Sequence, residues 1–227
     1  MLAEITVDDA VWALRPDFAT LVITVRGLAG GPSDDGSREL LVDAAKNAAD
    51  PAGDPHVAAW REAYRSFGAK PKRTRPSVDA LLRRAPGGLP EINRVVDAYN
   101  ATSVRHALPI GGEDLARYDG AARLVRASGD EPFDTAAAGE PVVEHPEPGE
   151  VVWRDDTGVT CRRWNWRQCR RTQITEATRD ALFILERLAP MTLEELRTAG
   201  EELVALLTAD APDARVESRL LTRRPGR

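Results

Sequence analysis

The chain has 227 residues, of which 42% are hydrophobic and 30% are charged, a composition typical of a soluble globular protein. Its formal net charge of −5 excludes a uniformly basic nucleic-acid binder, and no apolar run reaches the roughly 18 residues that a membrane span requires. The N-terminus carries acids where a signal peptide would carry bases, so we expect a cytoplasmic protein. Because no long Gly/Ser linker divides the chain, we predict a single domain over residues 1–210 and a flexible tail at 211–227.

Helices predominate in the first half of the chain. Asp54 can cap a helix, Pro55 suits its first turn and Gly68 ends it. Trp60 and Tyr64 recur on the apolar face of this helix, and we expect them to be core residues. The elements expected in this half are a short helical or extended piece to Leu14, a strand at 18–27 and helices over about 37–49, 54–68, 76–85 and 90–103.

Strands predominate in the second half. Thr192 and Glu195 can form a capping box that begins a helix over 192–210. With helices first and last, the order predicts an α+β fold, in which helices pack on a mixed, mostly antiparallel central sheet. The expected pieces are strands at 104–108, 122–128, 151–155 and 159–164, an exposed loop or hairpin arm at 129–150, and a buried strand or short helix at 180–188.

Charge is unevenly distributed along the chain. Residues 61–84 hold eight bases against two acids, and residues 161–171 hold five bases and no acid. Residues 127–160, by contrast, hold nine acids and one base. The two basic segments could meet and form a surface for phosphates, or each could pair with the acidic segment, and the sequence leaves both interpretations open.

The segment 161-CRRWNWRQCRR-171 is the most unusual in composition, with five arginines, two tryptophans and two cysteines. A metal site, a nucleic-acid contact, a small-molecule pocket and a buried strand are the alternatives. Cys161 and Cys169 lie eight residues apart with no histidine nearby, so we expect no metal. No glycine-rich nucleotide motif or GxSxG nucleophile motif occurs either, and we expect no cofactor. Tryptophan offers a stacking surface and arginine a planar fork for carboxylate or phosphate, as a binding site needs. Tryptophan pairs also fill cores and arginine stems cover them, so the composition leaves both interpretations open.

A series of motifs resembles one known family. The stretch 89-LPEINRVVDAYNATSVRHALPIGGEDL-115 has Asn and Asp residues on successive helical turns, and Pro109 is followed five residues later by Asp114. The segments after it keep the same order, namely 120-GAARLVRASGDEPF-133, 147-EPGEVVWRDD-156, 161-CRRWNWRQC-169 and 172-TQITEATRDALFILE-186. Over about residues 60–190 the chain is similar to the tRNA-editing domain of the beta chain of bacterial phenylalanyl-tRNA synthetase, and to free-standing proteins built from that domain.

This resemblance implies the location of a pocket. Asn100 matches the asparagine at a helix end, Tyr99 stands where the synthetase has a small hydroxyl residue, and Glu186 matches a glutamate at a strand end. Gly111 occupies the position of the synthetase's pocket histidine. The synthetase's glycine-rich turn is replaced by 164-WNWRQC-169, which implies a pocket of different size and hydrogen-bonding character.

The resemblance therefore implies a trans-acting deacylase that hydrolyses the ester bond of mischarged aminoacyl-tRNA. The alternative is a non-catalytic module with the same fold that binds tRNA or an amino-acid-like metabolite. Neither DNA nor a membrane is an expected partner. In the deacylase, Asn100 and Asn165 would hold the ester carbonyl, Gln168 or the terminal ribose would orient water, and Arg167 would contact the amino-acid carbonyl or the terminal phosphate. The expected substrate-binding residues are Tyr99, Asn100, Gly111, Trp164, Asn165, Trp166, Arg167, Gln168 and Glu186, and the expected tRNA-backbone contacts are Lys70, Lys72, Arg73 and Arg75.

Overall fold

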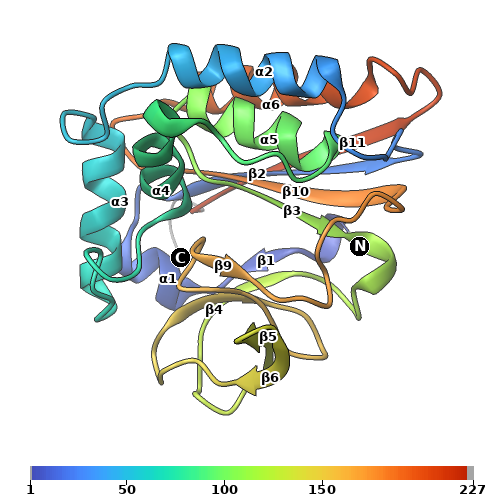
Figure 1. Ribbon diagram of the computed structural model, residues 1–227. Helices are drawn as coiled ribbons and strands as arrows, with labels where there is room; N and C mark the ends of the chain where they lie inside the picture. The colour runs from blue at the N-terminus through green and yellow to red at the C-terminus, as the bar shows by residue number, and fades with distance from the viewer. Residues whose placement is uncertain (1, 224–227) are drawn as a thin grey trace.

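The computed structural model describes residues 2–223 and has two sheets stacked face to face (Figure 1). The upper sheet has the order β11-β2-β10-β3, and all its pairings are antiparallel. The lower sheet has the order β1-β4-β7-β8-β9, with a parallel β1–β4 pair and antiparallel pairs elsewhere. The strands are β1 (Thr6–Val7), β2 (Ala19–Arg26), β3 (Ile110–Asp114), β4 (Arg123–Arg126), β5 (Phe133–Ala137), β6 (Glu140–Glu144), β7 (Val151–Arg154), β8 (Val159–Arg162), β9 (Arg167–Gln168), β10 (Asp180–Arg187) and β11 (Arg215–Thr222).

The helices cover the outer face of the upper sheet and one end of the space between the sheets. In Figure 1, α2, α5 and α6 lie above the upper sheet, while α3 and α4 stand together at one side. This arrangement confirms the predicted α+β class with a mixed, mostly antiparallel set of strands. The helices are α1 (Asp9–Leu14), α2 (Asp35–Lys46), α3 (Pro55–Ser66), α4 (Ser77–Arg84), α5 (Arg94–Arg105) and α6 (Leu193–Thr208), and short 3-10 helices occur at Leu2–Glu4, Ala85–Gly87 and Leu115–Arg117. Within residues 2–223, none of the helices combines the length and the apolar character needed to cross a membrane.

Strand β10 is the central element of the upper sheet and separates two hydrophobic cores. Its residues alternate, so Leu182 and Ile184 face the core between the sheets, whereas Phe183 and Leu185 face the core under α5 and α6. Because both faces are covered, β10 has a nearly continuous apolar sequence. Such a run fits a buried strand and a short helix equally well, which explains why both were predicted for residues 180–188.

Two parts of the sequence-based prediction are wrong. Residues 104–108 are not a strand, because α5 continues to Arg105 and the chain turns through Ala107 at a φ of 50° before β3 begins. Val104 is buried and completes the apolar side of α5, which imitated a strand pattern. The tail is not loose throughout, because Arg215–Thr222 form β11 and pair along β2. As an edge strand with mostly exposed residues, β11 has little apolar alternation. Residues 224–227 of the predicted tail lie outside the described residues.

Most of the remaining elements agree with the prediction to within a few residues, but strand β3 at Ile110–Asp114 was not predicted. The acidic stretch 129–150 contains the β5–β6 hairpin, which extends below the lower sheet as an arm (Figure 1). The expected core residues Trp60 and Tyr64 are both fully buried. Asp54 caps α3 by accepting a hydrogen bond from the backbone N–H of Val57, and Thr192 and Glu195 form the capping box of α6.

Candidate functional site

The turn between β8 and β9 sets the geometry of the tryptophan pair. The strand does not continue through it, because Arg163 and Trp164 adopt left-handed φ values of 47° and 69° and Cys161 pairs with Gln168 across the turn. Two successive bulky residues in this region are uncommon and are held by the surrounding packing. The turn places the side chains of Trp164 and Trp166 in different environments.

Trp164 points into the core and Trp166 lies at the surface. The Trp164 ring packs edge-on against Phe18 and Trp60, with centroids 5.1 Å and 5.4 Å away, and is fully buried. Trp166 is partly exposed, and the guanidinium carbons of Arg163 and Arg167 each lie 4.5 Å from its ring centroid. The core interpretation and the binding-site interpretation of this segment therefore each hold for one tryptophan.

A cavity of about 250 Å³ lies between the two sheets, beside α4 and the middle of α5. Its wall includes all nine residues that the sequence analysis expected to bind substrate, although they come from four separate segments of the chain. That these residues bind a substrate stays a prediction. The structure adds eight lining residues that were not among the expected substrate-binding residues, namely Ser77, Ala80, Leu81, Ile110, Glu113, Trp153, Cys161 and Ile184.

Glu186 is a buried carboxylate at one end of this cavity. Its Oε1 accepts a 2.9 Å hydrogen bond from Trp153 Nε1, and its Oε2 accepts one of 2.8 Å from Asn165 Nδ2. Asn165 Oδ1 in turn accepts a 2.8 Å hydrogen bond from the Tyr64 hydroxyl. Burial raises the pKa of Glu186 to about 8, although the hydrogen bonds from Asn165 and Trp153 oppose the shift. The amide of Asn165 therefore orients Glu186, and its contact with an ester carbonyl stays a prediction.

Glu113 is a second buried carboxylate on the cavity wall. It is 1% exposed, and its Oε2 accepts a 2.8 Å hydrogen bond from Thr172 Oγ1. Burial raises its pKa to about 7, against the effect of hydrogen bonds from Thr172, Tyr118 and Thr160. The sequence analysis missed this residue because it expected no strand at 110–114, and an acid buried in a strand is rare unless the acid has a role.

Four buried polar groups on the cavity wall lack a hydrogen-bond partner of normal geometry. They are the side-chain amide of Asn100, the hydroxyls of Tyr99 and Ser77, and the indole N–H of Trp164, and the statement covers residues 2–223 only. Trp164 Nε1 is directed toward Glu186 closely enough to contribute to holding down its pKa, but does not complete a normal hydrogen bond. Buried polar groups are nearly always paired, so these four are available to a ligand.

Two adjacent glycines in β3 have different neighbours. A Cβ added at Gly112 would lie 2.8 Å from both Ile174 Cδ1 and Tyr99 Cε1, so Gly112 is needed for close packing. A Cβ at Gly111 would lie 3.5 Å from Gln168 Nε2, which is ordinary contact. Gln168 donates a 2.7 Å hydrogen bond to the carbonyl of Gly112 and so lies over the space that a larger side chain at position 111 would fill.

Most arginines of the 161–171 segment are paired with acids. Arg162 binds Glu150 and Glu144, and Arg163 also approaches Glu150, at 3.7 Å. The remaining pairs are Arg170–Asp134 and Arg171–Asp155. The interpretation that this segment neutralises residues 127–160 is therefore confirmed for four of its arginines. Within the described part of the chain, Arg167 alone among the five makes no ion pair and lies at the mouth of the cavity.

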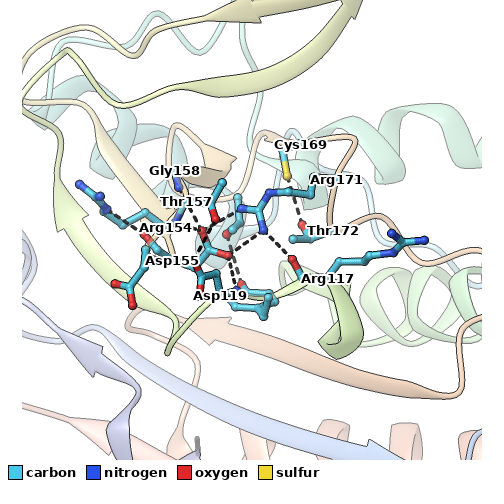
Figure 2. Close-up of polar contacts among 12 residues, drawn as sticks. Arg117, Asp119, Arg154, Asp155, Thr157, Gly158, Cys169, Arg171 and Thr172 are labelled. Atoms are coloured by element: carbon cyan, nitrogen blue, oxygen red, sulfur yellow. Dashed lines mark hydrogen bonds and ion pairs between the residues drawn. The ribbon is translucent and has the colours of Figure 1, made fainter.

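Asp155 is the centre of the largest of these networks (Figure 2). Both its oxygens accept 2.8 Å hydrogen bonds from Arg171, and they also accept backbone N–H groups of Asp119, Thr157 and Gly158. Burial alone would raise the pKa of Asp155, but Arg171 and the backbone donors hold it below its usual value. The network joins Asp155 to Arg171, and so holds the chain on both sides of residues 161–168, which include the cavity-lining turn.

The expected tRNA contacts lie in the loop after α3. None of Lys70, Lys72, Arg73 and Arg75 has an acidic partner among residues 2–223. Lys70 and Arg73 line a separate hollow of about 420 Å³ together with Arg163, whereas Lys72 and Arg75 do not line it. Because Arg163 also contacts the Trp166 ring, the basic hollow and the mouth of the cavity share one edge.

The histidine and cysteine residues form no obvious reactive centre. His56 donates from Nδ1 to the Ala107 carbonyl and accepts at Nε2 from Trp60 and Leu188, so both ring nitrogens are used inside the core. Burial raises the pKa of the Cys161 thiol well above its ordinary value. Among the described side chains, no group of three or more His, Cys, Asp or Glu residues is arranged to hold a metal ion.

The family comparison agrees with the resemblance seen in the sequence. The sequence profile of the B3/4 domain matches residues 59–204. No curated protein gives a match. Among solved structures, an N-terminal fragment of the phenylalanyl-tRNA synthetase beta-subunit from Pyrococcus horikoshii is similar, with 12% identity and a TM-score of 0.47 over 96% of this chain and 54% of that one. The chain thus spans about half the length of that fragment.

Proposed function

Because the chain belongs to the B3/4 domain family of the phenylalanyl-tRNA synthetase beta-subunit, we propose that it is a deacylase of mischarged aminoacyl-tRNA. In this reaction water attacks the ester carbonyl, the bond from that carbon to the ribose oxygen breaks, and the oxygen leaves as the hydroxyl of the terminal ribose. The free amino acid and the uncharged tRNA are the products. The proposal includes a cytoplasmic location, where aminoacyl-tRNA is used.

The observation that carries the proposal is a cavity of amino-acid size with unpartnered polar groups on its wall. Its volume of about 250 Å³ is below the roughly 300–1,000 Å³ of pockets for drug-sized ligands, so it suits an aminoacyl group and excludes the whole terminal nucleotide. The amide of Asn100 is free to donate to the ester carbonyl. Such a donor stabilises the negative charge that develops on the carbonyl oxygen as water attacks.

Water needs a hydrogen-bond acceptor that orients it. Gln168 uses its Nε2 on the carbonyl of Gly112, which leaves its Oε1 to accept from water at the cavity mouth. The terminal ribose hydroxyl next to the ester can assist in the same way. Positioning and charge stabilisation of this kind support catalysis without a protein base. Arg167, which is exposed and not ion-paired among the described residues, is available to the terminal phosphate.

The basic hollow beside the cavity supports binding of the tRNA backbone. Lys70 and Arg73 lie there without acidic partners, next to Arg163. Two acids, Glu147 and Glu150, also line the hollow, so its phosphate contacts would come from the side that carries Lys70 and Arg73. Phosphate binding by such bases should weaken steeply with added salt.

The alternative is a module that binds tRNA or an amino-acid-like metabolite without hydrolysing it. One observation favours it, because the residues that line the cavity include no histidine and no serine or cysteine paired with a base. Gly111 occupies the position where the resemblance places a histidine. The two functions differ in turnover and not in the expected ligand.

A deacylation assay with a panel of mischarged tRNAs tests the proposal. We expect hydrolysis above the buffer rate for at least one pair, and a decrease of about 100-fold or more in kcat for Asn100→Ala. Asn47→Ala, at an exposed asparagine on α2's C-terminal cap, is the matched control and should keep the wild-type rate. If no pair is hydrolysed while tRNA or amino acid still binds, the protein is the non-catalytic module.

A further inference from the structure

The cavity has a carboxylate at each end. Glu113 on β3 pairs with Leu182 on β10, four residues before Glu186 on the same strand and the same face. With about 3.3 Å of rise per residue and about 4.8 Å between strands, the two glutamate Cα atoms are roughly 14 Å apart. Both side chains nevertheless line the same cavity, so they approach it from opposite ends.

Gly111 leaves the space between these carboxylates open. It pairs with Ile184, which lies midway between Leu182 and Glu186 along β10, and it shares a face with Glu113. Any larger side chain at position 111 would project between the two acids. The absence of a side chain there gives a ligand access to Glu113.

Neither carboxylate has a cationic partner. The donors to Glu186 are the neutral groups of Trp153 and Asn165, and those to Glu113 are hydroxyls, with Thr172 at 2.8 Å. Arg167 is the single basic residue on the cavity wall, and it is exposed at the mouth. A buried carboxylate that ionises normally gains a cation or several N–H donors, so an ionised acid in this cavity has room for one positive charge that the described protein does not supply.

Glu113 is better suited than Glu186 to receive that charge. The two donors on Glu186 are N–H groups fixed in direction by an indole ring and an amide. The donors around Glu113 are hydroxyls, which can rotate and exchange partners when a ligand binds. The unpartnered amide of Asn100, which is nine-tenths buried on the same wall, is independent evidence that the cavity is built to hold a polar ligand.

We propose that Glu113 binds the α-ammonium group of the aminoacyl moiety, so that the cavity selects substrates with a free amino group. This inference rests on the proposed deacylase function and deepens it, because it identifies the substrate class as unblocked aminoacyl esters. N-acylated esters, such as those of N-acetylated or peptidyl-tRNA, are excluded because they lack the charge and carry extra bulk. Glu186 then faces the other end of the ligand.

The test compares each mischarged tRNA of the panel with its N-acetylated form. A parallel binding arm uses non-hydrolysable 3′-aminoacylamino-3′-deoxyadenosines of tyrosine, alanine and serine, each free and N-acetylated. We expect the free amine to be preferred by about 10-fold to 100-fold in kcat/KM and in Kd. Glu113→Gln should reduce this preference to a few-fold. Gly111→Leu should abolish binding of the free amine, because its side chain fills the access to Glu113.

Glu131→Gln is the matched control, since Glu131 is also buried but lies outside the cavity, bound by the backbone N–H groups of Ser128 and Gly129. It should keep the wild-type preference. Equal hydrolysis of free and N-acetylated tRNA by the wild type would overturn this inference and leave the deacylase intact. No hydrolysis, together with preferential binding of the free amine, would overturn the deacylase and leave the ammonium site intact. Equal binding of both analogues would overturn the ammonium site.

Discussion

Asn165 donates a 2.8 Å hydrogen bond from Nδ2 to Oε2 of Glu186, and the two residues are 21 positions apart in the chain. Tyr64 completes the series by donating to Asn165 Oδ1. The three residues connect α3, the β8–β9 turn and β10, so one amide holds the buried carboxylate in place from the opposite sheet. Residues 164–169, which the resemblance places at the synthetase's glycine-rich turn, thus orient the acid at the end of the cavity.

Asn165→Ala should destabilise the protein by about 2–3 kcal/mol, because it leaves the buried Tyr64 hydroxyl and one oxygen of Glu186 without partners. The free energy of unfolding in urea is the measurement. Asn47→Ala, which removes an exposed amide bound to Asp43, should cost less than about 1 kcal/mol. Similar losses in the two variants would mean that Asn165 does not bridge the buried Tyr64 and Glu186 side chains.

The neighbouring glycines of β3 should respond differently to alanine. Gly112→Ala should cost about 1–3 kcal/mol, because its methyl would lie 2.8 Å from Ile174 and from Tyr99. Gly111→Ala should change stability by less than about 1 kcal/mol, since its methyl makes only ordinary contact with Gln168. Thermal unfolding of the pair checks this, and a larger loss at Gly111 would contradict the open space assigned to that position.

The two buried glutamates should make stability depend on pH. The pKa of Glu186 is raised from 4.5 to about 8 and that of Glu113 to about 7, so the folded protein holds protons that the unfolded chain releases. Their stabilising contribution is complete below about pH 4.5 and is lost as pH rises through 7 to 8. We expect the stability of wild type to fall relative to Glu186→Gln between pH 5.5 and 8.5, by at most about 1.4 kcal/mol per pH unit.

Comparison with the Gln variant isolates this effect. His56, whose pKa is lowered by burial, makes the folded state less stable as pH falls below 6.5, but it does so in both proteins. Urea unfolding at several pH values gives the difference curve for Glu186→Gln, and Glu113→Gln gives the second curve. Curves parallel to wild type across this range would show that the carboxyls are not raised.

Local signals predicted much of the fold. The caps at Asp54 and Thr192, and the apolar periodicity that follows each cap, predicted helices α3 and α6 to within a few residues. The edge strand β11 was missed because its residues are mostly exposed, and pairing with β2 is a long-range event that local pattern does not encode. The strand expected at 104–108 failed for the opposite reason, because a short apolar run at a helix end also fits a strand.

The cavity was predicted in part. Residues carried over from the resemblance lie together on its wall, while Glu113 was missed because no strand was expected at 110–114 and its burial follows from strand pairing. For the positive charge of residues 161–171, the sequence left open whether the arginines bind phosphates or pair with acids. Four of the five arginines are neutralised by acids from residues 127–160, and only the folded chain brings those partners together.

Asp155→Asn should destabilise the protein by about 2–3 kcal/mol. It removes the charge from a fully buried carboxylate and leaves Arg171, three-quarters buried, without its ion pair. Asp180→Asn is the matched surface change, because Asp180 and Arg26 are both more than a third exposed, and it should cost less than about 1 kcal/mol. Equal costs in urea unfolding would show that the Figure 2 network contributes no more than a surface pair.

The basic hollow gives the last prediction, which concerns tRNA binding and depends on ionic strength. Replacing both Lys70 and Arg73 by Gln should make the slope of log K against log salt shallower, by about 0.7–0.9 for each phosphate that the variant no longer binds. Titration of uncharged tRNA between 50 and 200 mM salt, a range over which phosphate binding weakens strongly, measures this slope. Lys46→Gln, at an exposed base on α2 that lines a different hollow, should leave the slope unchanged. An equal change with Lys46→Gln would mean that binding follows net charge and that the hollow beside the cavity does not bind the tRNA backbone.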